Sequence, residues 1–202
     1  NGHTGPVRCL VEFPNLMLLS GSHDKSLKLW DLKSDSKDSL RTIKHDSMGR
    51  ITVCIVINSE DIAFGSEANI RIINFNSGAV KQTLRGHKSI VRDLLLLEHK
   101  DSQVILSASE DKTIMMWNIV EGTCLKTFNG HTRSVNRILP FNDEIIVSAG
   151  DDGAIKFWKT ETAECTKTLT GHEGWISYFT ILSNGNLISC GDDKTIKIWG
   201  PE

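Results

Sequence analysis

The chain has 202 residues, 39% of them hydrophobic and 24% charged, so it is long enough to bury a sizeable core. A formal net charge of −2 excludes a chain-wide field that would attract nucleic acid or a membrane surface. The sequence contains neither an apolar run of 18 residues nor a signal peptide, so no membrane insertion is expected.

The first predicted elements are short β-strands separated by turn residues. The apolar and β-branched runs are residues 7–12, 16–20, 26–31 and 40–43. Pro14 and Asn15 supply turn chemistry after the first run, and residues 23–25 supply it after the second. This order predicts one four-stranded antiparallel sheet.

The same order of runs returns along the whole chain. A Gly-His or Lys-His pair opens each unit, with histidines at His3, His45, His87, His131 and His172. They are 42, 42, 44 and 41 residues apart, which is the period of four-stranded propeller blades. Later fourth strands are expected at residues 80–84, 124–128 and 165–169. Small sheets must bury both faces against their neighbours, and radial stacking around an axis does this.

Four units keep three further residue types at fixed spacing after the His. A Ser precedes an Asp by four residues, and that Asp precedes a Trp by six. The sets are His3, Ser20, Asp24 and Trp30; His87, Ser107, Asp111 and Trp117; His131, Ser148, Asp152 and Trp158; and His172, Ser189, Asp193 and Trp199. An indole N–H only donates and a carboxylate only accepts, whereas Ser and neutral His do both. The four side chains are therefore expected to close a hydrogen-bonded chain.

With these four sets in register, the sequence resembles the WD-repeat β-propeller family, whose blades carry such a His, Ser/Thr, Asp, Trp tetrad. The resemblance implies an all-β propeller of four-stranded antiparallel blades over residues 1–202. The five repeats are expected at about 1–38, 39–79, 80–123, 124–164 and 165–202. Nineteen predicted strands leave the last unit one strand short, which suggests five blades of a seven-bladed propeller; a five-bladed ring is the alternative.

The second repeat is degenerate. It has Phe64, Ala68 and Ile73 at the Ser, Asp and Trp positions, and all three are apolar. Replacing every partner of a polar network is nearly neutral, whereas removing one partner is not. His45 is then expected to be solvated or paired differently.

The resemblance also implies a narrow, ligand-binding face. It is lined by residues that flank the start of each innermost strand: Pro6 and Arg8, Arg50 and Thr52, Ile90 and Arg92, Ser134 and Asn136, and Trp175 and Ser177. It is also lined by the residues before the tetrad Asp positions: His23, Glu67, Glu110, Asp151 and Asp192.

Three arginines on this face, Arg8, Arg50 and Arg92, suggest a clamp for an anion or a phosphopeptide. The pattern looks like that of F-box/WD-repeat ubiquitin-ligase substrate receptors, although the sequence has no F-box. The alternative is that these arginines pair with Glu67, Glu110 and Asp151 across neighbouring blades and give a neutral rim.

Two insertions and one tryptophan complete the candidate surfaces. Residues 32–39 and 98–103 lengthen two loops on the opposite, wider face, where solvated loops or a second partner site are the two interpretations. Trp175 stands before an inner strand, either packed on the adjacent blade or exposed as an interface anchor.

An enzyme is not expected. His87, Ser107 and Asp111 are the residue types of a catalytic triad, but the set recurs four times, lacks a nucleophile-elbow sequence, and its Trp competes for the hydroxyl. No zinc-ligand spacing and no phosphate-binding loop is present, so neither a metal nor a cofactor is expected.

The cysteines point to a reducing compartment. The five residues Cys9, Cys54, Cys124, Cys165 and Cys190 are odd in number, form no Cys-x-x-Cys pair and lie mostly in apolar runs. Reduced, buried thiols in a cytoplasmic or nuclear protein are expected. The sequence thus predicts a scaffold that binds other proteins or peptide motifs within a larger complex, with no direct nucleic-acid binding.

Overall fold

The computed structural model describes residues 2–44, 48–100 and 102–200, which fold into nineteen strands. They form five antiparallel sheets in which consecutive strands are neighbours. His45, for which a solvated or altered environment is predicted, lies outside the described residues.

The first three sheets follow the order of the chain. The first sheet holds β1 (Val7–Phe13), β2 (Met17–Ser22), β3 (Ser26–Asp31) and β4 (Arg41–Lys44). The second holds β5 (Ile51–Val56), β6 (Asp61–Ser66), β7 (Asn69–Asn74) and β8 (Val80–Arg85). The third holds β9 (Val91–His99), β10 (Ser102–Ser109), β11 (Thr113–Asn118) and β12 (Cys124–Asn129).

The last two sheets continue the same order. The fourth holds β13 (Val135–Pro140), β14 (Ile145–Gly150), β15 (Ala154–Lys159) and β16 (Cys165–Thr170). The fifth holds β17 (Ile176–Ile181), β18 (Leu187–Gly191) and β19 (Ile196–Trp199), and has three strands. We call the five sheets blades 1 to 5. The fourth strand of a blade lies at the start of the next sequence repeat, so the blades are offset by one strand from the repeats.

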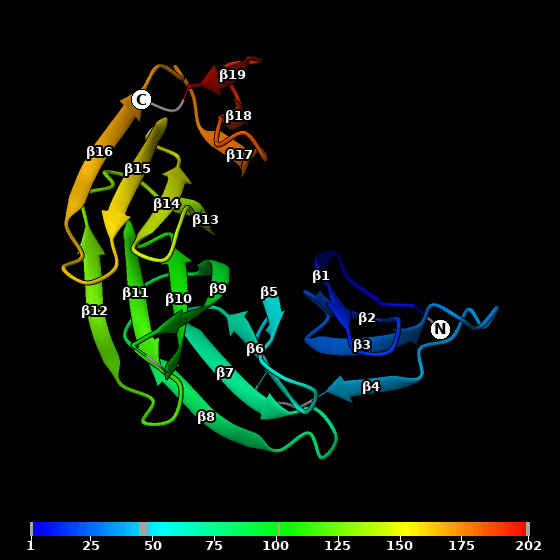
Figure 1. Ribbon diagram of the computed structural model, residues 1–202. Coiled ribbons are helices and arrows are strands. Elements are labelled where there is room, and N and C mark those ends of the chain that lie inside the picture. Colours follow the sequence, from blue (N-terminus) through cyan, green and yellow to red (C-terminus); the bar gives the residue numbers. More distant parts are fainter. Residues whose placement is uncertain (1, 45–47, 101, 201–202) are drawn as a thin grey trace.

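The blades follow one another around an open arc, as Figure 1 shows. The innermost strands β1, β5, β9, β13 and β17 contact one another in that order. Blade 1 and blade 5 lie at the two ends of the arc, so the described residues do not form a closed five-bladed ring.

The core lies between blades rather than within one sheet. Four apolar clusters fill the contacts between blades 1 and 2, 2 and 3, 3 and 4, and 4 and 5. In the degenerate blade, Phe64 and Ile73 are both fully buried in the first of these clusters. Burial of apolar surface there replaces the missing polar network.

Two local expectations need correction. The expected loop insertion at residues 98–103 is largely strand: β9 runs to His99, β10 begins at Ser102, and these two residues pair. The expectation of buried cysteines also fails, because only Cys54 is buried and Cys124 is exposed on an outermost strand. All five cysteines are free thiols.

No helix long and apolar enough to cross a membrane occurs in the part of the chain that the structure describes. The same residues contain no group of three or more His, Cys, Asp or Glu side chains arranged to hold a metal ion.

Candidate functional site

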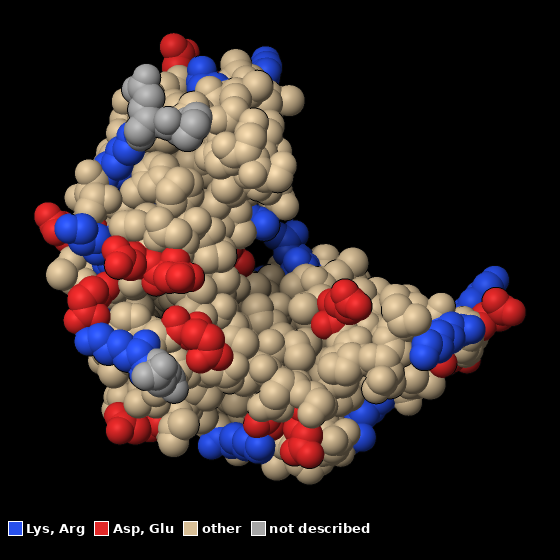
Figure 2. Space-filling model, viewed as in Figure 1, with Lys and Arg blue, Asp and Glu red and all other residues tan. Residues whose placement is uncertain are grey.

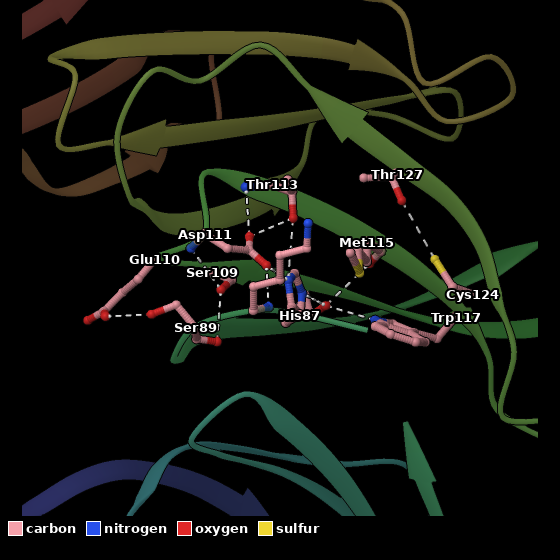
Figure 3. Close-up of polar contacts among 12 residues, drawn as sticks. His87, Ser89, Ser109, Glu110, Asp111, Thr113, Met115, Trp117, Cys124 and Thr127 are labelled. Carbon is pink, nitrogen blue, oxygen red and sulfur yellow. Dashed lines mark hydrogen bonds and ion pairs between the residues drawn. The ribbon is translucent and has the colours of Figure 1, made fainter. Parts of the chain in front are cut away.

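The four intact tetrads share one geometry, drawn for blade 3 in Figure 3. Trp117 Nε1 donates to Ser107 Oγ at 2.8 Å, and Ser107 Oγ lies 2.7 Å from His87 Nε2. His87 Nδ1 lies 2.8 Å from an oxygen of Asp111. Because the carboxylate only accepts, Nδ1 carries the proton, and Nε2 accepts from the Ser hydroxyl. The corresponding distances in blades 1, 4 and 5 lie between 2.7 and 2.9 Å.

The tetrad aspartates are held as carboxylates. Burial alone would raise the pKa of Asp111, but hydrogen bonds from Thr113, the Lys88 amide and His87 outweigh it and lower the pKa. The pKa values of Asp24, Asp152 and Asp193 are lowered in the same way. Burial lowers the pKa of His87, which keeps that ring neutral and able to accept.

A hydroxyl that the tetrad pattern does not include supports three of these carboxylates. Ser26, Thr113 and Thr195 each donate to the Asp two residues before them, at 2.6, 2.6 and 2.8 Å. The sequence signal was an Asp followed after one residue by Ser or Thr. In blade 4 that position is Ala154, whose backbone amide donates to Asp152.

The tetrad fixes the turn that presents one set of face residues. The residue before each tetrad Asp donates its backbone N–H to the residue before the inner strand: His23 to Pro6, Glu110 to Ile90, Asp151 to Ser134 and Asp192 to Trp175, at 2.8–2.9 Å. In blades 4 and 5 this approach requires glycine, because a side chain at Gly150 or Gly191 would collide with the carbonyl of Ser134 or Trp175. These turns are therefore rigidly placed.

A β-bulge at the start of every innermost strand presents the second set of face residues. Where each innermost strand pairs with the next strand of its blade, the pairing skips one residue. The skipped residues are Arg8, Thr52, Arg92, Asn136 and Ser177. A bulge leaves the extra residue unpaired and re-aims its side chain. The sequence did not predict these bulges.

All five bulge residues line one pocket of about 490 Å³ at the axis of the arc, which we call the axial pocket. It is completed by Ile90 and Trp175, which precede inner strands, and by His23, Glu110 and Asp151 from the turns. Figure 2 shows Lys and Arg side chains at the concave notch of the arc and mixed charges elsewhere on that view. A pocket of this volume lies within the range of ligand sites.

All ten residues that line the axial pocket are among the fifteen predicted face residues. The other five, Pro6, Arg50, Glu67, Ser134 and Asp192, do not line it. Arg50 still lies close enough to act on His23, whose pKa is lowered by burial and by the charges of Arg8 and Arg50. Trp175 is 49% exposed, so it is not packed away against the adjacent blade.

The two arginines that line the pocket differ in their partners. Arg92 forms an ion pair with Glu110 at 2.5 Å, and Ser89 Oγ donates to the same carboxylate at 3.1 Å. This pair lies within blade 3, not across blades as the neutral-rim alternative supposed. Arg8 has no ion pair or hydrogen bond with the residues that the structure describes.

Two bulge residues also join neighbouring blades. Thr52 Oγ1 donates to the Val91 carbonyl at 2.6 Å, and Asn136 Nδ2 donates to the Ile176 carbonyl at 2.9 Å. Asn136 Nδ2 also donates to Asp151 Oδ1 at 2.7 Å. The pocket wall is thereby fixed from blade to blade.

The degenerate blade differs at its turn as well as in its side chains. Ser66 pairs with Asn69, so Glu67 and Ala68 form a two-residue hairpin turn. In blade 1, five residues separate the paired Gly21 and Leu27, against four between Gly65 and Ile70 in blade 2. Ala68 is therefore not a simple replacement of the tetrad Asp, because the turn has lost a residue.

Comparison with known proteins gives matches over most of the chain. The family described as "WD domain, G-beta repeat" matches residues 1–31, 78–118, 122–159 and 163–200. The WD40 β-propeller domain of Doa1 is similar in structure, with a TM-score of 0.83 and 26% identity over 98% of this chain and 66% of that domain.

Curated relatives match over part of their length. A WD repeat-containing protein of Schizosaccharomyces pombe is 32% identical over 70% of this chain and 40% of its own length. Nuclear distribution protein nudF 1 of Talaromyces marneffei is 34% identical over 70% of this chain and 31% of its own length. The chain thus spans less than half of either relative.

Proposed function

The chain belongs to the WD-repeat β-propeller family, whose members are typically protein-interaction scaffolds, and on that premise we propose that it binds peptide segments or domains of partner proteins at the axial pocket. The convergence of five bulge residues on one pocket carries this proposal. Cytoplasmic or nuclear residence, which the free thiols favour, is part of the same proposal.

The pocket has the features of a pre-formed recognition site. Backbone bonds from the turns and side-chain bonds between blades hold its wall, so little ordering free energy is lost on binding. Trp175 offers an exposed aromatic surface beside polar groups, which is the composition of an interface anchor.

The tetrads support a structural rather than a catalytic role for their serines. Ser107 is fully buried, and its Oγ already accepts from Trp117 and bonds His87. A substrate carbonyl would have to displace these partners to reach the hydroxyl. Turnover of a generic ester that disappeared in a folded Ser107→Ala protein would overturn the non-enzymatic proposal.

A ubiquitin-ligase substrate receptor that binds a phosphorylated or acidic degron is the second candidate. It would use the arginines of the pocket face, of which Arg8 is free of partners among the described residues. Two features weigh against a phosphate clamp. Arg92 is neutralised by Glu110, and Asp151 shares the pocket and would repel phosphate.

The experiment is affinity capture from a cell lysate with the protein and with its Arg8→Ala plus Arg92→Ala variant, followed by mass spectrometry. The proposal predicts partners that the parent protein retains and the variant loses. Recovery of cullin-adaptor subunits among them would favour the receptor. Partners retained equally by both proteins would contradict docking at the axial pocket.

A further inference from the structure

The charges of the axial pocket are separated by blade. On blade 1, Arg8 is exposed and makes no ion pair or hydrogen bond with the described part of the chain. His23 lies beside it, and burial together with Arg8 and Arg50 lowers its pKa, so at neutral pH the imidazole is uncharged. This wall therefore presents the unpaired guanidinium of Arg8 to the pocket, whereas Arg50 lies near His23 but does not line the pocket.

The two charged residues that blade 3 contributes to the pocket neutralise each other. Arg92 and Glu110 form their ion pair with side-chain exposures of 40% and 24%, and Ser89 adds a hydrogen bond to the carboxylate. A ligand that used Arg92 would have to compete with this pair.

Blades 4 and 5 form the opposite wall, which is acidic and aromatic. Asp151 Oδ1 accepts from Asn136, whereas Oδ2 receives no hydrogen bond from the residues that the structure describes. Trp175 and Ser177 line the pocket from blade 5. An exposed indole beside a carboxylate attracts a cationic side chain through both the ring face and the negative charge.

We propose that the axial pocket selects a peptide segment carrying both a carboxylate and a cationic side chain, the carboxylate bound by Arg8 and the cation by Asp151 and Trp175. This inference rests on the proposed function and adds to it the chemistry of the ligand. A segment with only acidic or phosphorylated residues satisfies Arg8 but places like charge against Asp151. A segment with only basic residues satisfies Asp151 but places like charge against Arg8.

The probes are four immobilised decapeptide libraries on a randomised neutral background. One fixes a Lys and a Glu at varied separation, the second fixes Lys alone, the third Glu alone, and the fourth phosphoserine alone. The intact protein should be retained on the Lys plus Glu library at least tenfold more strongly than on any of the others.

Two variants test the assignment of each wall. Arg8→Glu should lower retention on the Lys plus Glu library at least tenfold and make the Lys library the preferred one. Asp151→Asn keeps an oxygen that can accept from Asn136 and should shift preference toward the Glu library. Lys33→Glu and Asp35→Asn, in the exposed loop on the other face, are charge-matched controls and should leave retention unchanged.

A third variant tests the ion pair of blade 3. Glu110→Gln removes the carboxylate that holds Arg92 and should raise retention on the Glu and phosphoserine libraries several-fold. Unchanged retention there would show that Arg92 does not face the ligand.

Equal or stronger retention on the phosphoserine library by the parent protein would overturn the inference, as would no retention on any library. Neither result by itself contradicts the scaffold proposal, because lysate partners lost by Arg8→Ala plus Arg92→Ala would still place docking at the pocket.

Discussion

Trp158 Nε1 donates to Ser148 Oγ at 2.8 Å in blade 4, and both side chains are fully buried. His131 and Asp152 continue this chain of bonds to the turn that carries Asp151 into the axial pocket. In blades 1, 3 and 4 the repeated tetrad thus couples the core of the blade to the placement of a pocket residue: His23, Glu110 or Asp151.

Replacing Asp152 by Ala should lower the free energy of unfolding by about 1–3 kcal/mol. The change leaves His131 Nδ1 and the amides of Thr132 and Ala154 without their acceptor. Denaturant midpoints of the two proteins measure the effect. Asp143→Ala, in an exposed turn of the same blade, is the control and should be neutral. A harmless Asp152→Ala would mean that the tetrad contributes no stability there.

Placing an Asp at Ala68 should not stabilise the degenerate blade. The β6–β7 turn is one residue shorter than its counterpart in blade 1, and Phe64 and Ile73 stand where Ser and Trp would be. The new carboxylate would have no tetrad to complete, because the Ser and Trp that continue the chain of bonds beyond the His are absent. The same denaturant titration applies, and a rise in midpoint for Ala68→Asp would show that a partial network forms after all.

Asp93 should make stability depend on pH in the direction opposite to the tetrad aspartates. Burial raises the pKa of Asp93 to about 6, against partial compensation by the amides of Ile138 and Leu94 and by Arg137. Its unfolded pKa is about 3.9. Between these values the folded state binds a proton that the unfolded state lacks, so stability from this group is full below about pH 4 and is lost as pH rises through about 6.

An Asp93→Asn variant tests this dependence because its side chain does not titrate. The free energy of unfolding of the variant minus that of the parent should increase from pH 5 to pH 7, because only the parent loses stability as Asp93 ionises. Asp143→Asn is the matched control, since its carboxylate is on an exposed residue. A difference that stays constant across this range would contradict the raised pKa.

Much of the fold could be predicted from the sequence, because strand runs, turn residues and the His, Ser, Asp, Trp spacing are local patterns. The WD-repeat family and the all-β propeller of four-stranded sheets are confirmed. The pairing of Glu98 and His99 with Gln103 and Ser102 was missed, because a polar run of strand length looks like a loop when its partner strand is unknown.

The pocket could be predicted only in part. Positions such as Arg8 and Arg92 follow from the repeat, but the bulges depend on the register between two strands, which no single run encodes. The ion pair of Arg92 with Glu110 likewise depends on how close β9 lies to the β10–β11 turn in the folded blade 3. Sequence spacing placed both residues on one face and left their partners open.

Docking at the axial pocket is tested most sharply by the dissociation constant of a captured partner for three proteins: the parent, the Arg8→Ala plus Arg92→Ala variant, and a deletion of residues 34–37. Docking there predicts at least tenfold weaker binding for the double variant, about 1.4 kcal/mol, with nearly unchanged thermal stability. The deletion, in an exposed loop outside the pocket, should bind like the parent. Normal binding by the double variant and lost binding by the deletion would place the docking surface on the opposite face.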